Sequence, residues 1–408
     1  MSGVAAAPLA RNPAYLKLWL IGLLAGVVRW LEMLAFGIYA FDTTGSPTLV
    51  ALLVMLRFLP LAVFGVLVGA LSDLAGPRRL LVGGLAGVAL VAATMAALFR
   101  WGEPGYTAVA VATFLSGAFW AGDMPVRRRM VGDAVADERL TGAMALDGAA
   151  NNATRMLGPL VGGVLYGAIG IEGVFVTSAV FYAVALAVAA TLPGEHRPAR
   201  GTAAVAWLGE PFRQVAEAVR YALAHRDVLR ILLVTIVFNV WGFPYMTMVP
   251  VIGREELGLA PGTVGAVTAL EGLFALMGAL MIARNRRSFG LRRLYVGAVL
   301  ALFATTFTIG VVTGFWVLAL GLAVGGLCAS GFAAMQATLI YVVAPAAMRG
   351  RLLGLMTICI GAGVLGLANV GITAELVGAS NALWIIALQG LVPLLLVSRR
   401  WPELWARA

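Results

Sequence analysis

The sequence predicts an all-α polytopic membrane protein, with twelve transmembrane helices in two pseudo-symmetric six-helix bundles. The 408-residue chain is 61% hydrophobic and only 12% charged, whereas a soluble domain is about half apolar and a quarter charged. Its mean hydropathy is +0.95. Uninterrupted apolar runs such as 291–312 are as long as the roughly 20 residues that a helix needs to cross a bilayer.

Twelve such runs follow one another along the chain, separated by short polar turns. Two of them, 141–168 and 315–342, are long enough to protrude from the bilayer or to tilt within it. The predicted spans are 17–41, 48–71, 80–99, 106–124, 141–168, 173–192, 228–251, 261–283, 291–312, 315–342, 352–374 and 381–398.

The basic residues indicate the orientation of these spans. Most of the 29 lysines and arginines lie in every second loop, and the opposite loops hold only Arg100 and Arg254. Because cytoplasmic loops are enriched in Lys and Arg, we expect both termini to be cytoplasmic in a multi-pass protein of the cell (inner) membrane. This arrangement also explains the net charge of +10 without a nucleic-acid partner.

The longest polar segment separates two sets of six spans. We expect an N-terminal bundle at 1–192, a cytoplasmic linker at 193–227 and a C-terminal bundle at 228–408. Within the linker, residues 207–224 have an amphipathic pattern that is typical of a helix on the membrane surface. Short Gly/Arg/Leu motifs recur in both halves at nearly the same offset, as an internal duplication would produce.

Six charged residues lie inside the predicted spans and away from their ends. Ionised groups in hydrocarbon survive mainly where they face a bundle interior or a water-filled path, so we expect them around a central cavity where they take part in proton coupling. They are Arg29, Glu32, Arg57, Asp147, Arg155 and Glu271.

Glu32, tuned by Arg29, is the first candidate for the proton carrier, followed by Glu271 and Asp147. Arg29 and Glu32 share one helix face because they are three residues apart, so they could instead only neutralise each other. Asp147 could lie at the cytoplasmic interface, and Arg57 could attract an anionic substrate.

The loop after the second span carries a recognisable motif, Gly69-Ala-Leu-Ser-Asp73-Leu-Ala-Gly76-Pro-Arg78-Arg79. It resembles the cytoplasmic signature loop of the major facilitator superfamily, a resemblance that extends over essentially the whole chain. The resemblance implies the fold of that superfamily and a gating role for Gly69, Asp73, Gly76, Arg78 and Arg79. An ordinary positively charged loop with a turn glycine is the alternative.

The fifth span contains Gly158-Pro159-Leu-Val-Gly162-Gly163. This motif is similar to the fifth-helix signature of the superfamily's exporters, with Thr154 where that signature often has glycine. The stretch from Asp147 to Gly163, together with the turn at Thr44–Pro47, resembles the enterobactin-exporter and macrolide-efflux branch. The resemblance implies antiport, with Gly158 and Pro159 at a gating bend; a packing kink unrelated to transport direction is the alternative.

Polar and aromatic residues in three spans suit a large amphipathic ligand. The candidate substrate-cavity residues are Asn151, Asn239, Trp241, Tyr245 and Gln336. Packing in the core or against lipid is the alternative role for the aromatic side chains.

We therefore expect a monomeric secondary transporter that exports a small drug-like, macrolide-like or siderophore-like compound by alternating access, driven by protons. A lipid or lysophospholipid translocator and a non-transporting membrane receptor are the alternatives. The sequence has no nucleotide-binding phosphate loop, catalytic triad or metal-ligand cluster, so we expect no enzymatic activity, cofactor or metal.

Overall fold

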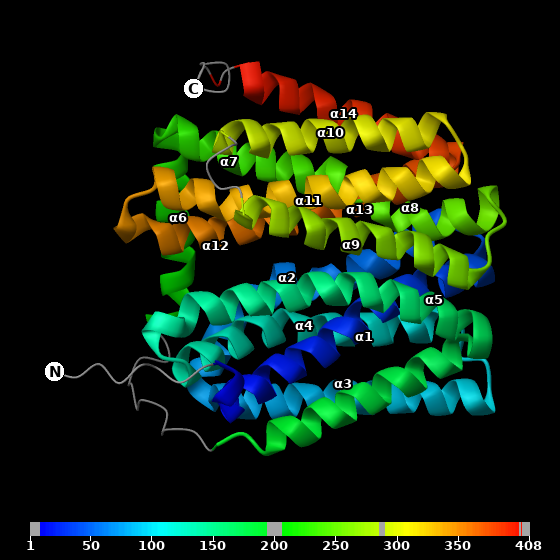
Figure 1. The fold of residues 1–408 in the computed structure, drawn as a ribbon, viewed down its shortest axis with the longest axis horizontal. Coiled ribbons are helices and arrows are strands. Elements are labelled where there is room, and N and C mark those ends of the chain that lie inside the picture. Colours follow the sequence, from blue (N-terminus) through cyan, green and yellow to red (C-terminus); the bar gives the residue numbers. More distant parts are fainter. Residues whose placement is uncertain (1–8, 194–205, 285–289, 400, 402–408) are drawn as a thin grey trace. The chain divides into compact units, whose positions relative to one another are not determined.

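The computed structural model describes residues 9–193, 206–284, 290–399 and 401, apart from the side chains of 62–75, 137, 206–212 and 346. All regular elements in these ranges are helices (Figure 1), which confirms the predicted all-α membrane fold. Ten helical segments of this described part are long and apolar enough to cross a bilayer, and 47–61 forms a shorter apolar helix.

The helices follow the predicted spans closely. In the first half they are α1 (Pro13–Thr44), α2 (Pro47–Ala75), α3 (Pro77–Trp101), α4 (Gly105–Ala134) and α5 (Asp137–Ala190). After α6 (Ala206–Ala224), the second half comprises α7 (Arg226–Val237), η2 (Phe238–Gly242), α8 (Tyr245–Val251), η3 (Ile252–Glu256), α9 (Pro261–Arg284), α10 (Leu291–Val311), α11 (Phe315–Val343), α12 (Ala346–Gly361), α13 (Gly363–Val377) and α14 (Ala379–Arg399).

Four spans depart from a simple helix. The fifth and sixth spans form the continuous element α5, in which Gly170 alone leaves helical geometry with φ 66° and ψ −166°; a positive φ of this size favours glycine. The seventh span alternates between α-helix and two π-helical turns, η2 and η3. The eleventh span consists of α12 and α13, which meet at Ala362.

The chain forms two compact units. Unit 1 comprises residues 1–39, 56–200 and 261–269, and unit 2 comprises 40–55, 201–260 and 270–408. The first turns of α2 therefore cluster with unit 2, and the start of α9 clusters with unit 1. The two units are described separately below.

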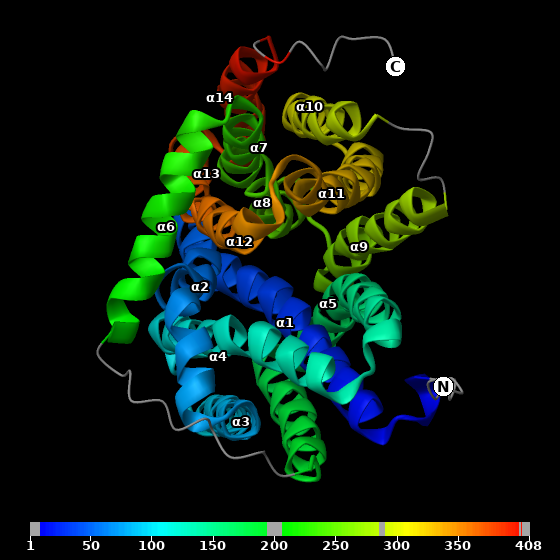
Figure 2. The same cartoon turned by 90° about the vertical axis from the view of Figure 1, so that its left-hand side faces the viewer.

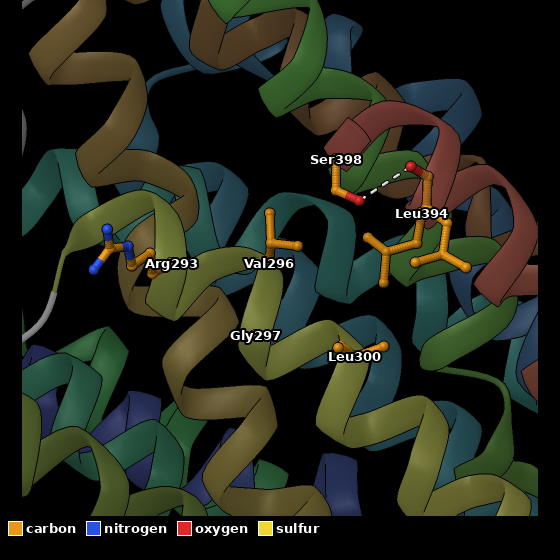
Figure 3. A pocket seen from close by; sticks show the side chains of 7 residues that line it. Arg293, Val296, Gly297, Leu300, Leu394 and Ser398 are labelled. Carbon is orange, nitrogen blue, oxygen red and sulfur yellow. Dashed lines mark hydrogen bonds between the residues drawn. The ribbon is translucent and has the colours of Figure 1, made fainter. Parts of the chain in front are cut away.

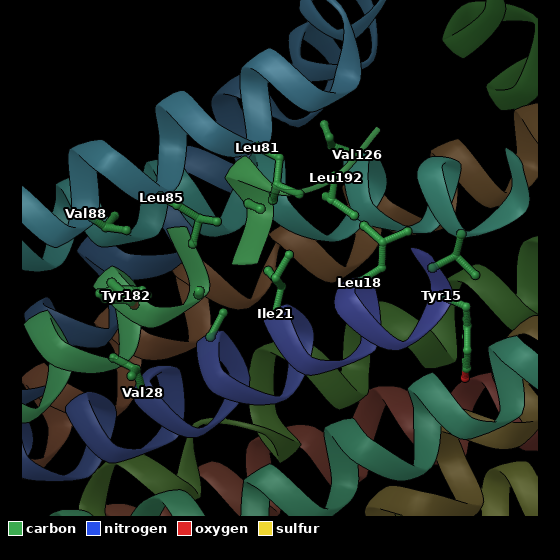
Figure 4. Packing of buried hydrophobic residues seen from close by; sticks show 14 of the residues in the cluster. Tyr15, Leu18, Ile21, Val28, Leu81, Leu85, Val88, Val126, Tyr182 and Leu192 are labelled. Carbon is green, nitrogen blue, oxygen red and sulfur yellow. The ribbon is translucent and has the colours of Figure 1, made fainter. Parts of the chain in front are cut away.

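Unit 1 has a core of interlocking apolar side chains from α1, α3, α4 and α5 (Figure 4). On α3, the buried positions Leu81, Leu85 and Val88 recur every three or four residues, which places them on one helix face. They pack with Leu18 and Ile21 of α1. Because lipid is as apolar as these side chains, close packing stabilises the contact more than any transfer from water.

The glycines of the fifth-span motif allow very close helix contacts on two sides of α5. A Cβ atom at Gly162 would lie 2.7 Å from the carbonyl oxygen of Leu31 on α1. On the other side, a Cβ at Gly265 of α9 would lie 3.0 Å from the Cα of Gly163. These glycines therefore bring α1 and α9 into close contact with α5.

In unit 2, helices α11 and α14 pack beside α7, and α10 packs on α11 and α14 (Figures 1 and 2). The predicted linker helix exists as α6, which packs on α12 and α7. Its buried face presents Ala218 and Ala222, while Val219 and Leu223 are 39% and 66% exposed. Glu217 forms an ion pair with Arg351 of α12 at 2.8 Å, so the linker helix is fixed to this unit.

We predict that Gly162→Ala lowers the melting temperature of the purified protein, because its methyl group would collide with the backbone of α1. Overpacking of this kind costs about 1–3 kcal/mol. The matched control is Gly148→Ala on the same helix, where a Cβ would have no neighbour within 4 Å. Thermal unfolding in detergent measures both; equal melting temperatures for the two variants would contradict the close contact.

Candidate functional site

Glu32 of α1 and Arg57 of α2 form a buried ion pair within unit 1. Arg57 Nη1 donates a hydrogen bond of 3.1 Å to Glu32 Oε2. The side chains are only 3% and 1% exposed, respectively. Two ionised groups this deep in a transmembrane region are costly and persist because they neutralise each other.

A second group of charges continues through α1, α4 and α5. Asp123 of α4 lies 3.6 Å from Arg29 and 3.7 Å from Arg127, measured between carboxylate oxygen and guanidinium nitrogen. Arg127 also donates a hydrogen bond to Asp147 of α5, whose other oxygen lies 3.5 Å from Arg128. Cations and anions therefore alternate in the order Arg29, Asp123, Arg127, Asp147 and Arg128, which we call the charge chain.

This geometry corrects two interpretations from the sequence. The first is the pairing of Arg29 with Glu32: these residues share one helix, but each forms its ion pair with a different neighbouring helix. The second concerns Arg127, which follows the predicted span 106–124 and was therefore expected in a loop; instead α4 continues to Ala134, and the Arg127 side chain is 5% exposed.

Sequence reasoning missed Asp123 altogether. It lies at the end of the predicted fourth span, where an acidic residue is ordinarily solvated. Its spacing of four residues from Arg127 was the available signal, since such pairs meet on one helix face. Asp147, expected either in a cavity or at the interface, is a buried member of the charge chain.

Small residues make room for these charges. The guanidinium group of Arg127 occupies the space beside Gly22 of α1 where a side chain would otherwise lie. Gly117 of α4 packs directly on the backbone at Arg57. Close approach of the helices and pairing of the charges therefore depend on the same glycines.

Aromatic rings cover two of the arginines. The guanidinium carbon of Arg29 lies 4.8 Å from the ring centre of Trp120, and that of Arg155 lies 5.2 Å from the ring centre of Trp30. Such cation–π contacts stabilise a desolvated cation. Asn151 is half-buried on α5, one turn before Arg155.

Unit 2 contains a buried network of neutral polar groups centred on Thr235 of α7. Gln336 Nε2 donates to Thr235 Oγ1 at 3.2 Å, and Asn239 Nδ2 donates to the Thr235 carbonyl oxygen at 2.8 Å. The Thr235 hydroxyl also bonds to Tyr295 at 2.8 Å. The structure thus brings together two predicted substrate residues, Asn239 and Gln336, and adds two that the sequence did not indicate.

The other unit 2 candidates lie near this network or on the following helices. Trp241 belongs to the π-helical turn η2 and packs on Gly390 of α14, while Tyr245 is buried at the start of α8. Glu271 of α9 is completely buried. Turns of π-helix inside a helix frequently occur at functional sites.

The gating candidates are only partly described. The side chains of Gly69 and Asp73 lie outside the described residues. Gly76 has φ 85°, as expected for a turn glycine. Arg78 donates a hydrogen bond of 2.9 Å to the carbonyl oxygen of Ala190 at the end of α5, and Arg79 is exposed. Gly158 packs on α1 beside Pro159.

Membrane-spanning helices with buried ion pairs and glycines at close helix contacts are typical of membrane transporters. Known transporter structures share the fold of this chain. The peptide transporter POT in complex with sulfate has 16% sequence identity and a TM-score of 0.74, and the match covers 99% of this chain and 96% of that one. The nucleoside transporter NupG has 13% identity and a TM-score of 0.71, with coverage of 97% and 100%. At these identities the likeness establishes the fold.

Residues 3–404 match the transmembrane secretion effector family (MFS_3), and the chain belongs to it. It is also 28% identical over 382 residues to the multidrug efflux pump Tap of Mycolicibacterium fortuitum, with 90% of each chain covered. The protein is therefore a membrane transporter and not an enzyme. The expected superfamily and its efflux branch are confirmed at this level.

We predict a strong energetic coupling between Glu32 and Arg57. Glu32→Gln or Arg57→Gln alone leaves one buried charge without its partner, which costs about 3–5 kcal/mol. Combining both substitutions removes both charges and should restore much of the lost stability. Melting temperatures of the two single variants and the double variant measure this coupling; additive losses would show that the pair does not stabilise the fold.

Proposed function

We propose that this protein is a proton-coupled exporter of a small amphipathic organic compound, working by alternating access. The observation that carries the proposal is the alternation of buried anions and cations across α1, α2, α4 and α5. Charges in membrane-spanning helices mark ion and proton pathways more often than they serve packing. The likeness to Tap, whose name describes a multidrug efflux pump, supports export.

Glu32 is the proposed proton carrier. It has one cationic partner in the described structure, Arg57 at 3.1 Å, so taking up a proton would release that arginine. The released cation would then need another anion or an anionic substrate, because an unpaired buried charge is costly. Protonation of one carboxylate could in this way change the helix contacts of α2.

The neutral network of unit 2 is the proposed substrate-binding surface. Amide and hydroxyl groups at Asn239, Gln336 and Thr235, with the aromatic residues Trp241 and Tyr245 further along the same span as Thr235, can bind a ligand that combines polar and apolar groups. Among the described residues of unit 2, one charged side chain is buried, that of Glu271. A largely neutral surface favours ligands of mixed polarity over highly charged ones.

Contacts at one end of unit 2 support a gate. Glu375 of α13 accepts hydrogen bonds from Ser46 Oγ at 2.6 Å and from the Thr48 amide at 3.2 Å. Asp42, which precedes Ser46 by four residues, forms an ion pair with Arg254 of η3 at 2.9 Å. Because these partners come from opposite halves of the sequence, movement of the predicted bundles against each other would break these bonds. We propose that this gate lies on the non-cytoplasmic side of the membrane, since we expect both termini to be cytoplasmic. We also propose that the transporter works as a monomer.

Proton coupling predicts a selective defect in Glu32→Gln. In proteoliposomes, transport driven by an imposed pH gradient should fall at least tenfold, because the neutral amide cannot carry a proton. Exchange of substrate for substrate without a gradient should continue. Glu255→Gln, at an exposed position of η3, is the matched control. Gradient-driven transport at the wild-type rate in Glu32→Gln would exclude Glu32 as the carrier.

The substrate class can be tested by ligand-dependent thermal stabilisation of the purified protein. Hydrophobic cations, siderophores and lysophospholipids form the panel, and Gln336→Leu should reduce the stabilisation by any true substrate because it removes a hydrogen-bond donor. Stabilisation and flux restricted to lysophospholipids would replace the proposed substrate with a lipid. No flux with any compound would favour a receptor role.

A further inference from the structure

A narrow groove opens between α10 and α14 of unit 2 (Figure 3). It has a volume of about 390 Å³ and is lined by Arg293, Val296, Gly297, Leu300, Leu394, Leu395 and Ser398. The residues of α10 recur every three to four positions, so they form one stripe along that helix. The groove is separate from the charge chain of unit 1 and from the Thr235 network.

The floor of the groove is apolar and its edges are accessible. Val296 and Leu394 are buried, whereas Leu300 and Leu395 are 44% and 40% exposed. At Gly297 an added Cβ atom would have no neighbour within 4 Å, so the absence of a side chain there keeps the groove open. Further along α10, Gly310 packs directly on the backbone of α14 at Ser380 and Trp384, which closes the space between the two helices.

A positive charge lies at one end of this apolar groove. Arg293 lines it and is exposed. The neighbouring Arg292 forms an ion pair with Asp227 at 2.9 Å and lies over the ring of Trp401. This end of α10 therefore combines one cationic side chain with an apolar slot.

We propose that the groove binds an anionic glycerophospholipid, with its phosphate at Arg293 and part of one acyl chain along Gly297 and Leu300. Arg293 and Leu300 are seven positions apart on α10, a length of about 10 Å, which is shorter than the roughly 15 Å hydrocarbon half of a bilayer. The upper part of one acyl chain thus fits the groove. Anionic lipids are concentrated on the cytoplasmic face, where we expect the basic loop before α10 to lie.

Charge complementarity distinguishes this occupant from a neutral lipid. A zwitterionic headgroup carries its own cation, which would be placed beside Arg293, whereas phosphatidylglycerol has a net negative charge. A ligand that binds only the folded protein raises its stability. Bound phosphatidylglycerol should therefore stabilise the protein more than phosphatidylcholine does.

The test compares phosphatidylglycerol and phosphatidylcholine with the same acyl chains, added to the full-length protein in detergent. Melting temperatures and native mass spectrometry measure stabilisation and bound lipid. We expect tighter retention of phosphatidylglycerol by the wild type. Gly297→Leu should fill the groove and reduce this retention at least tenfold, and Arg293→Gln should remove the preference between the two lipids.

Two substitutions outside the groove serve as controls. Gly87→Leu places the same side chain at an exposed glycine of α3 where a Cβ meets nothing within 4 Å, and Arg100→Gln removes a different terminal arginine. Both should bind lipid like the wild type. Equal retention of the two lipids by the wild type, or wild-type binding by Gly297→Leu, would overturn the proposal.

A photoreactive phosphatidylglycerol with a label on its acyl chain provides a test that needs no variant. Peptide mapping should find the label on residues 293–300 of α10 and 394–398 of α14. Labelling spread evenly over lipid-facing helices would indicate ordinary annular lipid and contradict a specific site. Displacement of the label by transported compounds would show that the groove is a substrate site instead.

Discussion

The need to pair ionised side chains inside the bilayer constrains unit 1 more than any other interaction. Glu32, Asp123 and Asp147 each lie within 4 Å of an arginine on another helix. Hydrocarbon offers no water to compensate a missing partner, so displacing any of these helices would leave a charge exposed to a low dielectric. The pairing therefore fixes the rotation of α1, α2, α4 and α5 about their axes, which apolar packing alone specifies weakly when lipid and protein interior are equally apolar.

Glycine positions and charge positions depend on each other in this arrangement. The arginine side chain is long, and its guanidinium group needs space between helices that otherwise pack closely. Gly22 provides that space for Arg127, and Gly117 lets α4 approach the backbone at Arg57. Adding a side chain at either position would separate the helices or move the guanidinium group. A change in helix packing would thus change the distances between paired charges, so the ion pairs of the charge chain are coupled to helix movement.

The sequence predicted the helices well and the contacts between them poorly, for a physical reason. The bilayer dictates the length and composition of each span, so a run such as 291–312 predicted α10 to within one residue. Partners across helices depend on axial rotation and vertical register, which hydropathy does not encode.

Arg29 and Glu32 share a helix face by spacing, yet they bind different helices. Asp123 and Arg127 were misjudged because α4 extends beyond its apolar run, to Ala134. The sequence predicted only Asn239 and Gln336 of the Thr235 network, since threonine and tyrosine are common in apolar helices.

The Glu32–Arg57 pair and the charge chain differ in the distances between their charged groups. Arg57 and Glu32 are within hydrogen-bond distance at 3.1 Å, whereas Asp123 lies 3.6 and 3.7 Å from its two arginines, beyond the usual range for a direct bond. A carboxylate shared loosely between two cations can approach either one after a small shift of α4, at little change in total pairing. Asp123 is therefore the member of the charge chain best suited to exchange partners when a neighbouring helix moves. Within the described part of the chain, the Glu32–Arg57 pair has no such alternative partner and must be broken instead. Protonation of the Glu32 carboxylate is the direct way to break it.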